Sequence, residues 1–136
     1  MGFDVKEDKG DSQVNAYIAH VGDNAIYNWY KKIITEIATG KYDVANNNKQ
    51  LTQNGPTYKQ LLYANLEYLL SKSSSDLRPA DDHKTSFYIK PSLNLREGSI
   101  LKWERGTGRI FKVYIQPNSD SYITKLFHDR FYTVFP

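Results

Sequence analysis

The first half of the chain repeats its hydrophobic residues with the period of an α-helix. Val14, Tyr17, Ile18 and Val21 follow the i, i+3, i+4, i+7 spacing of one helix face. Gly22 comes directly after them and favours a helix end, because glycine readily adopts the left-handed conformation found there. The pattern therefore predicts a short helix that ends at Gly22.

A longer apolar stripe predicts a second helix. Asp23 or Asn24 is a suitable N-cap, and Gly40 is a suitable end. The stripe consists of Ile26, Trp29, Tyr30, Ile33, Ile34 and Ile37. This is the clearest helical pattern in the chain.

A third helix is predicted after residues 41–56, which are rich in Asn, Gln, Gly and Pro and indicate a loop. Thr57 and Gln60 have the spacing of a capping box, which would open the helix. Its inward side chains would be Tyr58, Leu61, Leu62, Leu66, Leu69 and Leu70. The serines at 71–75 predict fraying of its end.

Beyond the polar stretch at 71–82 the hydrophobic period changes from helical to strand-like. The alternation of Phe111 and Val113 with Ile110 and Lys112 is typical of a strand. Candidate strands are residues 84–90, 99–104, 109–116, 121–127 and 131–135. Gly and Pro clusters at 106–108 and 117–120 supply turns between consecutive strands. Helices followed by hairpin-linked strands predict an α+β fold with an antiparallel β-meander, and they argue against an alternating parallel sheet.

Length and composition fit one domain. The chain has 136 residues, of which 40% are hydrophobic, and it contains no Cys, so disulfide scaffolds and thiolate chemistry are excluded. No apolar run reaches the roughly 18 residues that a membrane span requires. Residues 1–11 are polar and acidic and predict a flexible lead-in without a secretory signal, and residues 12–136 are expected to form a single domain.

Positive charge is concentrated in one region. The net charge is +3, and residues 83–116 hold seven Lys or Arg against two Asp or Glu. Aromatic residues alternate with these cations: Phe87, Tyr88, Trp103, Phe111 and Tyr114. Such a composition is typical of surfaces that neutralise phosphates and stack bases, and it also fits a solvated sheet whose outward positions favour Lys and Arg. The RNA-binding side chains predicted here are Lys84, Lys102, Arg105, Arg109, Lys112 and Tyr132.

Few reaction classes fit the remaining residues. The chain has no dinucleotide fingerprint, P-loop, HExxH or GxSxG motif. The run Asp81-Asp82-His83 reads better as a solvated turn than as a metal site, so neither a metal nor another cofactor is expected. Metal-free acid–base chemistry remains, and histidine is the natural proton carrier for it. RNA cleavage by its own 2′-hydroxyl suits a basic, aromatic surface, because the substrate supplies the nucleophile.

Four short segments resemble a known family. The run Ala19-His20-Val21-Gly22, the later Lys31 and the final Thr133-Val134-Phe135-Pro136 are similar to motifs of bacterial ribonuclease A-like toxin domains, and Pro56-Thr57-Tyr58 echoes the start of a family helix. The resemblance covers nearly the whole chain, but only as these islands. It implies a ribonuclease A-like fold and metal-independent cleavage of RNA, including tRNA, that leaves a 2′,3′-cyclic phosphate.

The resemblance also implies roles for individual residues. His20 would be the general acid or base, Lys31 would stabilise the oxyanion in place of the family's Arg, and Thr133 would donate to the scissile phosphate. Phe135 occupies the place of the family's terminal Tyr but has no hydroxyl. His128 or Tyr132 would have to replace that function. Lys31 also lacks the bidentate fork of Arg.

The biological setting implied by this family is interbacterial competition. Such domains form the C-terminal toxin of contact-dependent growth-inhibition exoproteins, which are secreted or exposed at the cell surface and delivered into the cytoplasm of target bacteria. Each is neutralised by a cognate immunity protein. We therefore expect RNA and an immunity protein as partners, and a monomer outside that complex.

Two other interpretations remain open. The chain would be a ribonuclease toxin of the EndoU or barnase-like kind if His83, His128 and Lys112 formed the site. It would be a non-catalytic nucleic-acid-binding module if the basic sheet bound RNA without cleaving it. An immunity or antitoxin protein is less favoured, because inhibitors of ribonucleases are usually acidic.

Overall fold

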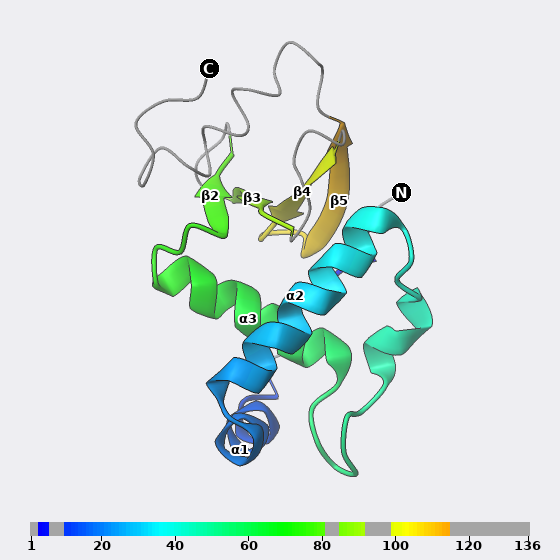
Figure 1. Cartoon of the computed structure of the whole chain (residues 1–136), viewed down its shortest axis with the longest axis vertical. Helices are drawn as coiled ribbons and strands as arrows, with labels where there is room; N and C mark the ends of the chain where they lie inside the picture. Colours follow the sequence, from blue (N-terminus) through cyan, green and yellow to red (C-terminus); the bar gives the residue numbers. More distant parts are fainter. Residues whose placement is uncertain (1–2, 6–9, 81–84, 92–98, 115–136) are drawn as a thin grey trace.

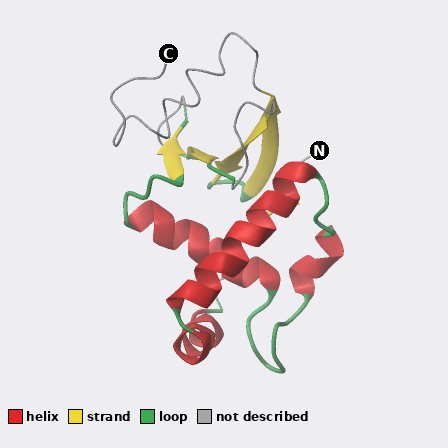
Figure 2. Ribbon diagram, viewed as in Figure 1, coloured by secondary structure: helices red, strands yellow, loops and turns green. Residues whose placement is uncertain are grey.

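The computed structural model describes residues 3–5, 10–80, 85–91 and 99–114. In these ranges the helices come first and an antiparallel sheet follows, which confirms the predicted α+β fold (Figures 1 and 2). The elements are β1 (Phe3–Asp4), α1 (Asp11–Val21), α2 (Asp23–Thr39), the 3₁₀-helix η1 (Val44–Asn48), α3 (Tyr58–Ser71), β2 (Leu77–Pro79), β3 (Ser86–Ile89), β4 (Ser99–Glu104) and β5 (Arg109–Tyr114).

The sheet has the strand order β1-β5-β4-β3-β2, and every neighbouring pair is antiparallel. Strands β2 to β5 follow one another in the sheet in sequence order and form an antiparallel meander, as predicted for β3 to β5. The short β1 pairs with the free side of β5, so that Phe3 lies opposite Ile110. Helices α2 and α3 lie against one face of this sheet (Figure 2).

The main core lies between α2, α3 and that face of the sheet. Trp103 and Ile110 are fully buried from the sheet side, and Tyr30, Ile34 and Leu66 are fully buried from the helices. Alternate residues of a strand point to opposite faces, so Leu101 and Trp103 of β4 face the helices together with Phe87 and Ile89 of β3. This core fixes which sheet residues point away from the helices.

Helix α1 is held by a second, smaller cluster. Val14 of α1 packs with Ile26 of α2 and Leu61 of α3, all of them nearly or completely buried. The cluster lies away from the sheet, and Figure 1 shows α1 at the end of α2 that is remote from the strands. Most of α1 therefore packs on the other helices, and only its side toward the larger hollow, with Asp11 and Asn15, shares a lining with Arg105 of the β4–β5 turn.

One glycine serves both α1 and α2. Gly22 has φ 86°, a conformation that favours glycine, and its N–H donates to the carbonyl of Ile18 at the end of α1. The same residue is the N-cap of α2, which has no side-chain cap. The prediction that Asp23 or Asn24 caps α2 was wrong, because the helix already begins at Asp23. The predicted end at Gly40 is confirmed.

The predicted capping box opens α3. Thr57 Oγ1 accepts a hydrogen bond from the N–H of Gln60, and the Gln60 side chain accepts one from the N–H of Thr57. The helix ends at Ser71, at the start of the serine run. In the preceding segment, expected to be entirely loop, Asp43 caps the short η1 by accepting from the N–H of Ala45.

Two strands were not predicted. Residues 3–5 belong to the expected flexible lead-in, yet Phe3–Asp4 form β1 and Val5 is fully buried. Leu77–Pro79 form β2 within the polar stretch, where one Leu gives no periodic signal. Pro79 has no backbone N–H, and this is tolerated because β2 lies at the edge of the sheet and pairs with a strand on one side only.

The other predicted strands agree with the structure to different extents. Strand β4 has the predicted bounds, β3 begins later than predicted, and β5 is described to Tyr114. The turn at 105–108 joins β4 to β5 as predicted. The candidate strands at 121–127 and 131–135 and the turn at 117–120 lie outside the described residues.

Candidate functional site

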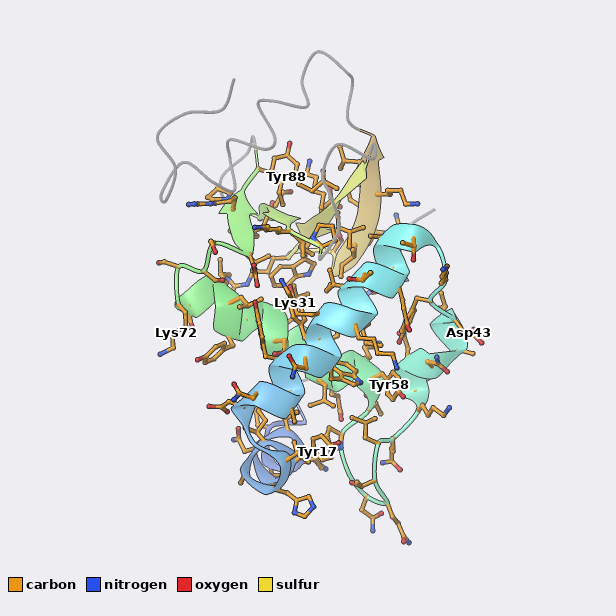
Figure 3. All side chains as sticks on the ribbon, in the orientation of Figure 1. Tyr17, Lys31, Asp43, Tyr58, Lys72 and Tyr88 are labelled. Carbon is orange, nitrogen blue, oxygen red and sulfur yellow. The ribbon has the colours of Figure 1, made fainter. Side chains whose placement is uncertain are left out.

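Lys31 lies between α2 and the segment that leads into β2. Its ammonium is 3.5 Å from Oδ2 of Asp76 and 5.5 Å from the ring centre of Tyr27 (Figure 3 labels Lys31). The Tyr27 hydroxyl donates a hydrogen bond to the same carboxylate oxygen. Tyr27 and Lys31 are one helix turn apart, so both side chains reach Asp76 from one face of α2. We call these three residues the Asp76 cluster.

Asp76 is held rigidly from several sides. Its side chain is buried, its N–H donates to Oγ of Ser74, and its carbonyl accepts from the N–H of Lys90. A buried carboxylate needs a nearby cation or donors to offset its desolvation. Lys31 and Tyr27 supply both, so the Asp76 cluster joins α2 to the sheet.

The tyrosines beside Asp76 have raised pKa values. Burial raises the pKa of Tyr27, and its hydrogen bond to Asp76 and the charge of that carboxylate raise it further. Burial also raises the pKa of Tyr30, with smaller effects from Asp76 and Tyr27. The Tyr30 hydroxyl is buried and has no hydrogen-bond partner among the described residues. Both phenols therefore stay protonated well into alkaline solution.

His20 lies in the last turn of α1 and is exposed. Within the described ranges it has no hydrogen-bond or ion-pair partner. The side chain is thus accessible to a substrate.

The structure does not bring His20 and Lys31 together. Lys31 lies eight residues after Asp23, about 12 Å along the axis of α2 from the corner where α1 ends. Its ammonium is directed to Asp76, on the sheet side of the helix. Groups that act on one phosphate must lie within hydrogen-bond reach of it. The two residues therefore do not form a preformed pair.

The predicted RNA-binding cations are distributed over both faces of the sheet. Lys102 lies opposite Tyr88 and Phe111, and Arg109 lies opposite Glu104, all on the face away from the helices. Figure 3 shows the labelled Tyr88 on that side. Exposed Lys112 lies opposite Leu101, so it belongs to the helix-facing side. Only Lys102 and Arg109 of the described predicted cations share the outer face.

A row of alternating cations and aromatic rings crosses this outer face. In register from β2 to β5 it contains Arg78, Tyr88, Lys102 and Phe111. The Lys102 ammonium is 5.9 Å from the ring centre of Phe111, a cation–π geometry. Arg78, Lys102 and Phe111 are half-buried, and Tyr88 is buried. We call these four residues the sheet row.

Arg105 has a structural partner. Its Nε and Nη2 donate to Oε1 and Oε2 of Glu67 at 2.8 and 3.1 Å, and the Tyr63 hydroxyl also donates to Oε1. The hydrogen bond to Glu67 is the main cause of the raised Arg105 pKa. This bidentate contact ties the β4–β5 turn to α3. Arg105 would have to leave Glu67 to bind a phosphate.

Two predicted stacking residues are unavailable to bases. Phe87 is only 6% exposed and Trp103 is fully buried, and both pack in the helix-facing core. Several other predicted residues lie outside the described ranges, namely His83, Lys84, His128, Tyr132, Thr133 and Phe135. Sequence reasoning missed Asp76, Tyr27 and Arg78. A lone Asp after a serine run and a lone Arg in a polar stretch give no distinguishing signal.

No protein-family model, curated protein or solved structure matches the chain. None of the helices in the described part is long and apolar enough to cross a membrane. The class defined by the fold is that of small α+β domains with N-terminal helices on one face of an antiparallel meander.

Proposed function

We propose that the chain is a metal-independent endoribonuclease toxin that binds RNA on the outer face of its sheet. The observation that supports this most is the sheet row, in which Arg78, Lys102 and Phe111 are half-buried on one face and Tyr88 is buried between them. Lys and Arg neutralise phosphates, and aromatic rings stack on bases of any sequence. Exposed Arg109 adds a further cation on the same face.

The reaction follows from the side chains present. A histidine takes the proton of the 2′-hydroxyl, the oxygen attacks the adjacent phosphorus, and the 5′-oxygen leaves with a proton from a second group. A cation offsets the charge that develops on the phosphate. The products are a 2′,3′-cyclic phosphate and a 5′-hydroxyl. Neither a metal nor another cofactor takes part.

The location of His20 bears on which histidine acts. Helix α1 lies at the end of α2 remote from the sheet (Figure 1), whereas the pairing register places the sheet row on the face of the sheet away from the helices. This separation counts against a site that joins His20 to the sheet row. The second candidate is an EndoU-like or barnase-like site built on His83, His128 and Lys112, of which the two histidines lie outside the described residues and Lys112 lies on the helix-facing side of the sheet. In the first candidate His20 acts with Lys31, which would exchange Asp76 for the phosphate. In both candidate sites Thr133 donates a hydrogen bond to the phosphate.

The test is a histidine scan of RNA cleavage in excess EDTA. His20→Ala, His83→Ala and His128→Ala are compared with the unchanged chain, with circular dichroism as the check of folding. Loss of a catalytic imidazole lowers the rate by about two orders of magnitude or more. We expect this loss for His83→Ala or His128→Ala if the second candidate is right, and for His20→Ala if the first is. Full activity in all three variants would contradict both.

Delivery and partners belong to the same proposal. The family resemblance supports a toxin domain carried by a secreted or cell-surface exoprotein into target bacteria. The net charge of +3 fits an acidic immunity protein as the neutralising partner. Growth arrest after cytoplasmic expression, relieved by co-expression of the adjacent reading frame, would support this role. Harmless expression of an active, folded chain would contradict it.

A further inference from the structure

We propose that a groove between the three α-helices binds a basic, apolar segment of a protein partner other than the acidic immunity protein. The groove consists of two adjoining hollows of about 270 and 500 Å³ that share Ile18, Ala64 and Tyr68 as lining residues. It lies on the helices, whereas the sheet row faces the other way. The inference does not depend on ribonuclease activity.

The walls of the smaller hollow are apolar and aromatic, whereas Asn15, Ser71 and Arg105 add polar groups to the larger one. The walls of the smaller hollow are formed chiefly by Ile18, Ile26, Tyr27, Leu61, Ala64 and Tyr68. Tyr68 is 56% exposed and Tyr27 is 39% exposed, and they are two of the three large exposed hydrophobic residues in the described part of the chain. Exposed tyrosines beside an apolar hollow are typical of binding hot spots, because they bury large area with little loss of side-chain entropy.

The charges around the groove select the occupant. Asp11 lines one hollow and Asp23 lines the other, and neither has an ion-pair partner among the described residues. Glu67 also lines the groove, but its charge is matched by Arg105. Lys72 places its ammonium 5.6 Å from the ring centre of Tyr68, so two carboxylates and one ammonium without ion-pair partners in the described part of the chain border the groove. Their balance is negative, although the whole chain carries +3. An acidic partner is repelled there, and a segment with Lys or Arg is attracted.

The size of the hollows limits what enters them. The smaller hollow has room for about one large side chain of a partner. A segment that inserts an aliphatic or aromatic side chain between Tyr27 and Tyr68 could place a cation beside Asp23. A second cation in the same segment would lie toward Asp11, across the shared wall formed by Ile18.

The test is a selection of random peptides displayed on phage against the folded chain. We expect enriched peptides to combine a large apolar residue with Lys or Arg within about one helical turn of it. A synthetic copy of one enriched peptide should bind at least about tenfold more weakly to Tyr68→Ser and to the Asp11→Asn, Asp23→Asn double variant, a loss of about 1.4 kcal/mol or more.

Matched controls come from the same chain. Val44→Ser removes an equally exposed apolar side chain at 57% exposure outside the groove, and Glu36→Gln removes a carboxylate outside it. Neither should change the affinity by more than about twofold. Absence of enrichment, enrichment of acidic peptides, or equal loss in the controls would overturn the proposal. A concentration-dependent dimer that Tyr68→Ser abolishes would assign the groove to a second copy and would overturn it as well.

Discussion

The ammonium of Lys31 lies 3.5 Å from the carboxylate of Asp76 and so joins α2 to the segment leading into β2. Lys31→Met should lower the free energy of unfolding by about 1–2 kcal/mol. This decrease is smaller than the one expected when a fully buried ion pair is broken, because the Lys31 side chain is 26% exposed and Tyr27 still donates to Asp76. Urea denaturation provides the measurement.

The neighbouring Lys32 is the matched control for this change. It is exposed, so Lys32→Met should alter stability by no more than about 0.5 kcal/mol. Equal effects of the two substitutions would show that the ion pair with Asp76 contributes nothing measurable. If Lys31 also acts on the phosphate, Lys31→Met lowers the cleavage rate under conditions where the variant is fully folded.

Tyr30 offers a test of the core. Its hydroxyl is fully buried without a partner among the described residues, so Tyr30→Phe removes a desolvation penalty and keeps the ring. We expect the free energy of unfolding to stay the same or to rise by about 1 kcal/mol. A fall of more than about 1 kcal/mol in a denaturation series would mean that the hydroxyl makes a stabilising hydrogen bond.

Stability should decline in alkaline solution. The pKa values of Tyr27 and Tyr30 are raised above the ordinary value of 10.0, chiefly by burial. Above that value the unfolded chain loses phenolic protons that the folded chain keeps, so the free energy of unfolding falls as pH rises toward the folded pKa. Below it both states are protonated and the two groups add no slope.

Denaturation midpoints between about pH 8 and pH 11 measure this effect. The Tyr27→Phe, Tyr30→Phe double variant should show a shallower decline above about pH 10 than the unchanged chain. Tyr42, whose pKa burial also raises, remains in the variant and leaves a residual slope. Identical curves for both proteins would contradict the assignment to Tyr27 and Tyr30.

The sequence predicted the helices better than the site. The apolar stripe of α2 and the Thr57–Gln60 capping box are local signals, and both helices form at the predicted places. Strand β2 was missed because one Leu in a polar stretch carries no period, and its register comes from pairing with β3. The Asp76 cluster joins residues 49 positions apart, so no local pattern could indicate it.

The predicted group of RNA-binding cations is divided between the two faces of the sheet. Lys102, Arg109 and Lys112 were predicted to act together because they lie close together in the sequence. Side chains alternate between the two faces along a strand. Arg109 and Lys112 are three positions apart in β5, so their side chains lie on opposite faces. The pairing register across the strands, which sequence alone does not reveal, decides which face each cation occupies.

RNA affinity should follow the face on which a cation lies. The Lys102→Gln, Arg109→Gln double variant should bind single-stranded RNA more weakly, with a salt dependence reduced by about 1–2 in log–log slope. Lys112→Gln changes a charge on the opposite face and should have a smaller effect per charge removed. Filter binding at several salt concentrations measures both. An equal effect per charge on the two faces would contradict the assignment of RNA to the outer face.

Metal-independent cleavage of RNA at its 2′-hydroxyl is tested by the end groups of RNA after incubation with the purified chain in excess EDTA. We expect fragments that carry a 2′,3′-cyclic phosphate and a 5′-hydroxyl, detected by mass spectrometry. Intact RNA bound tightly by the folded chain, or fragments with 3′-hydroxyl and 5′-phosphate ends, would contradict this mechanism.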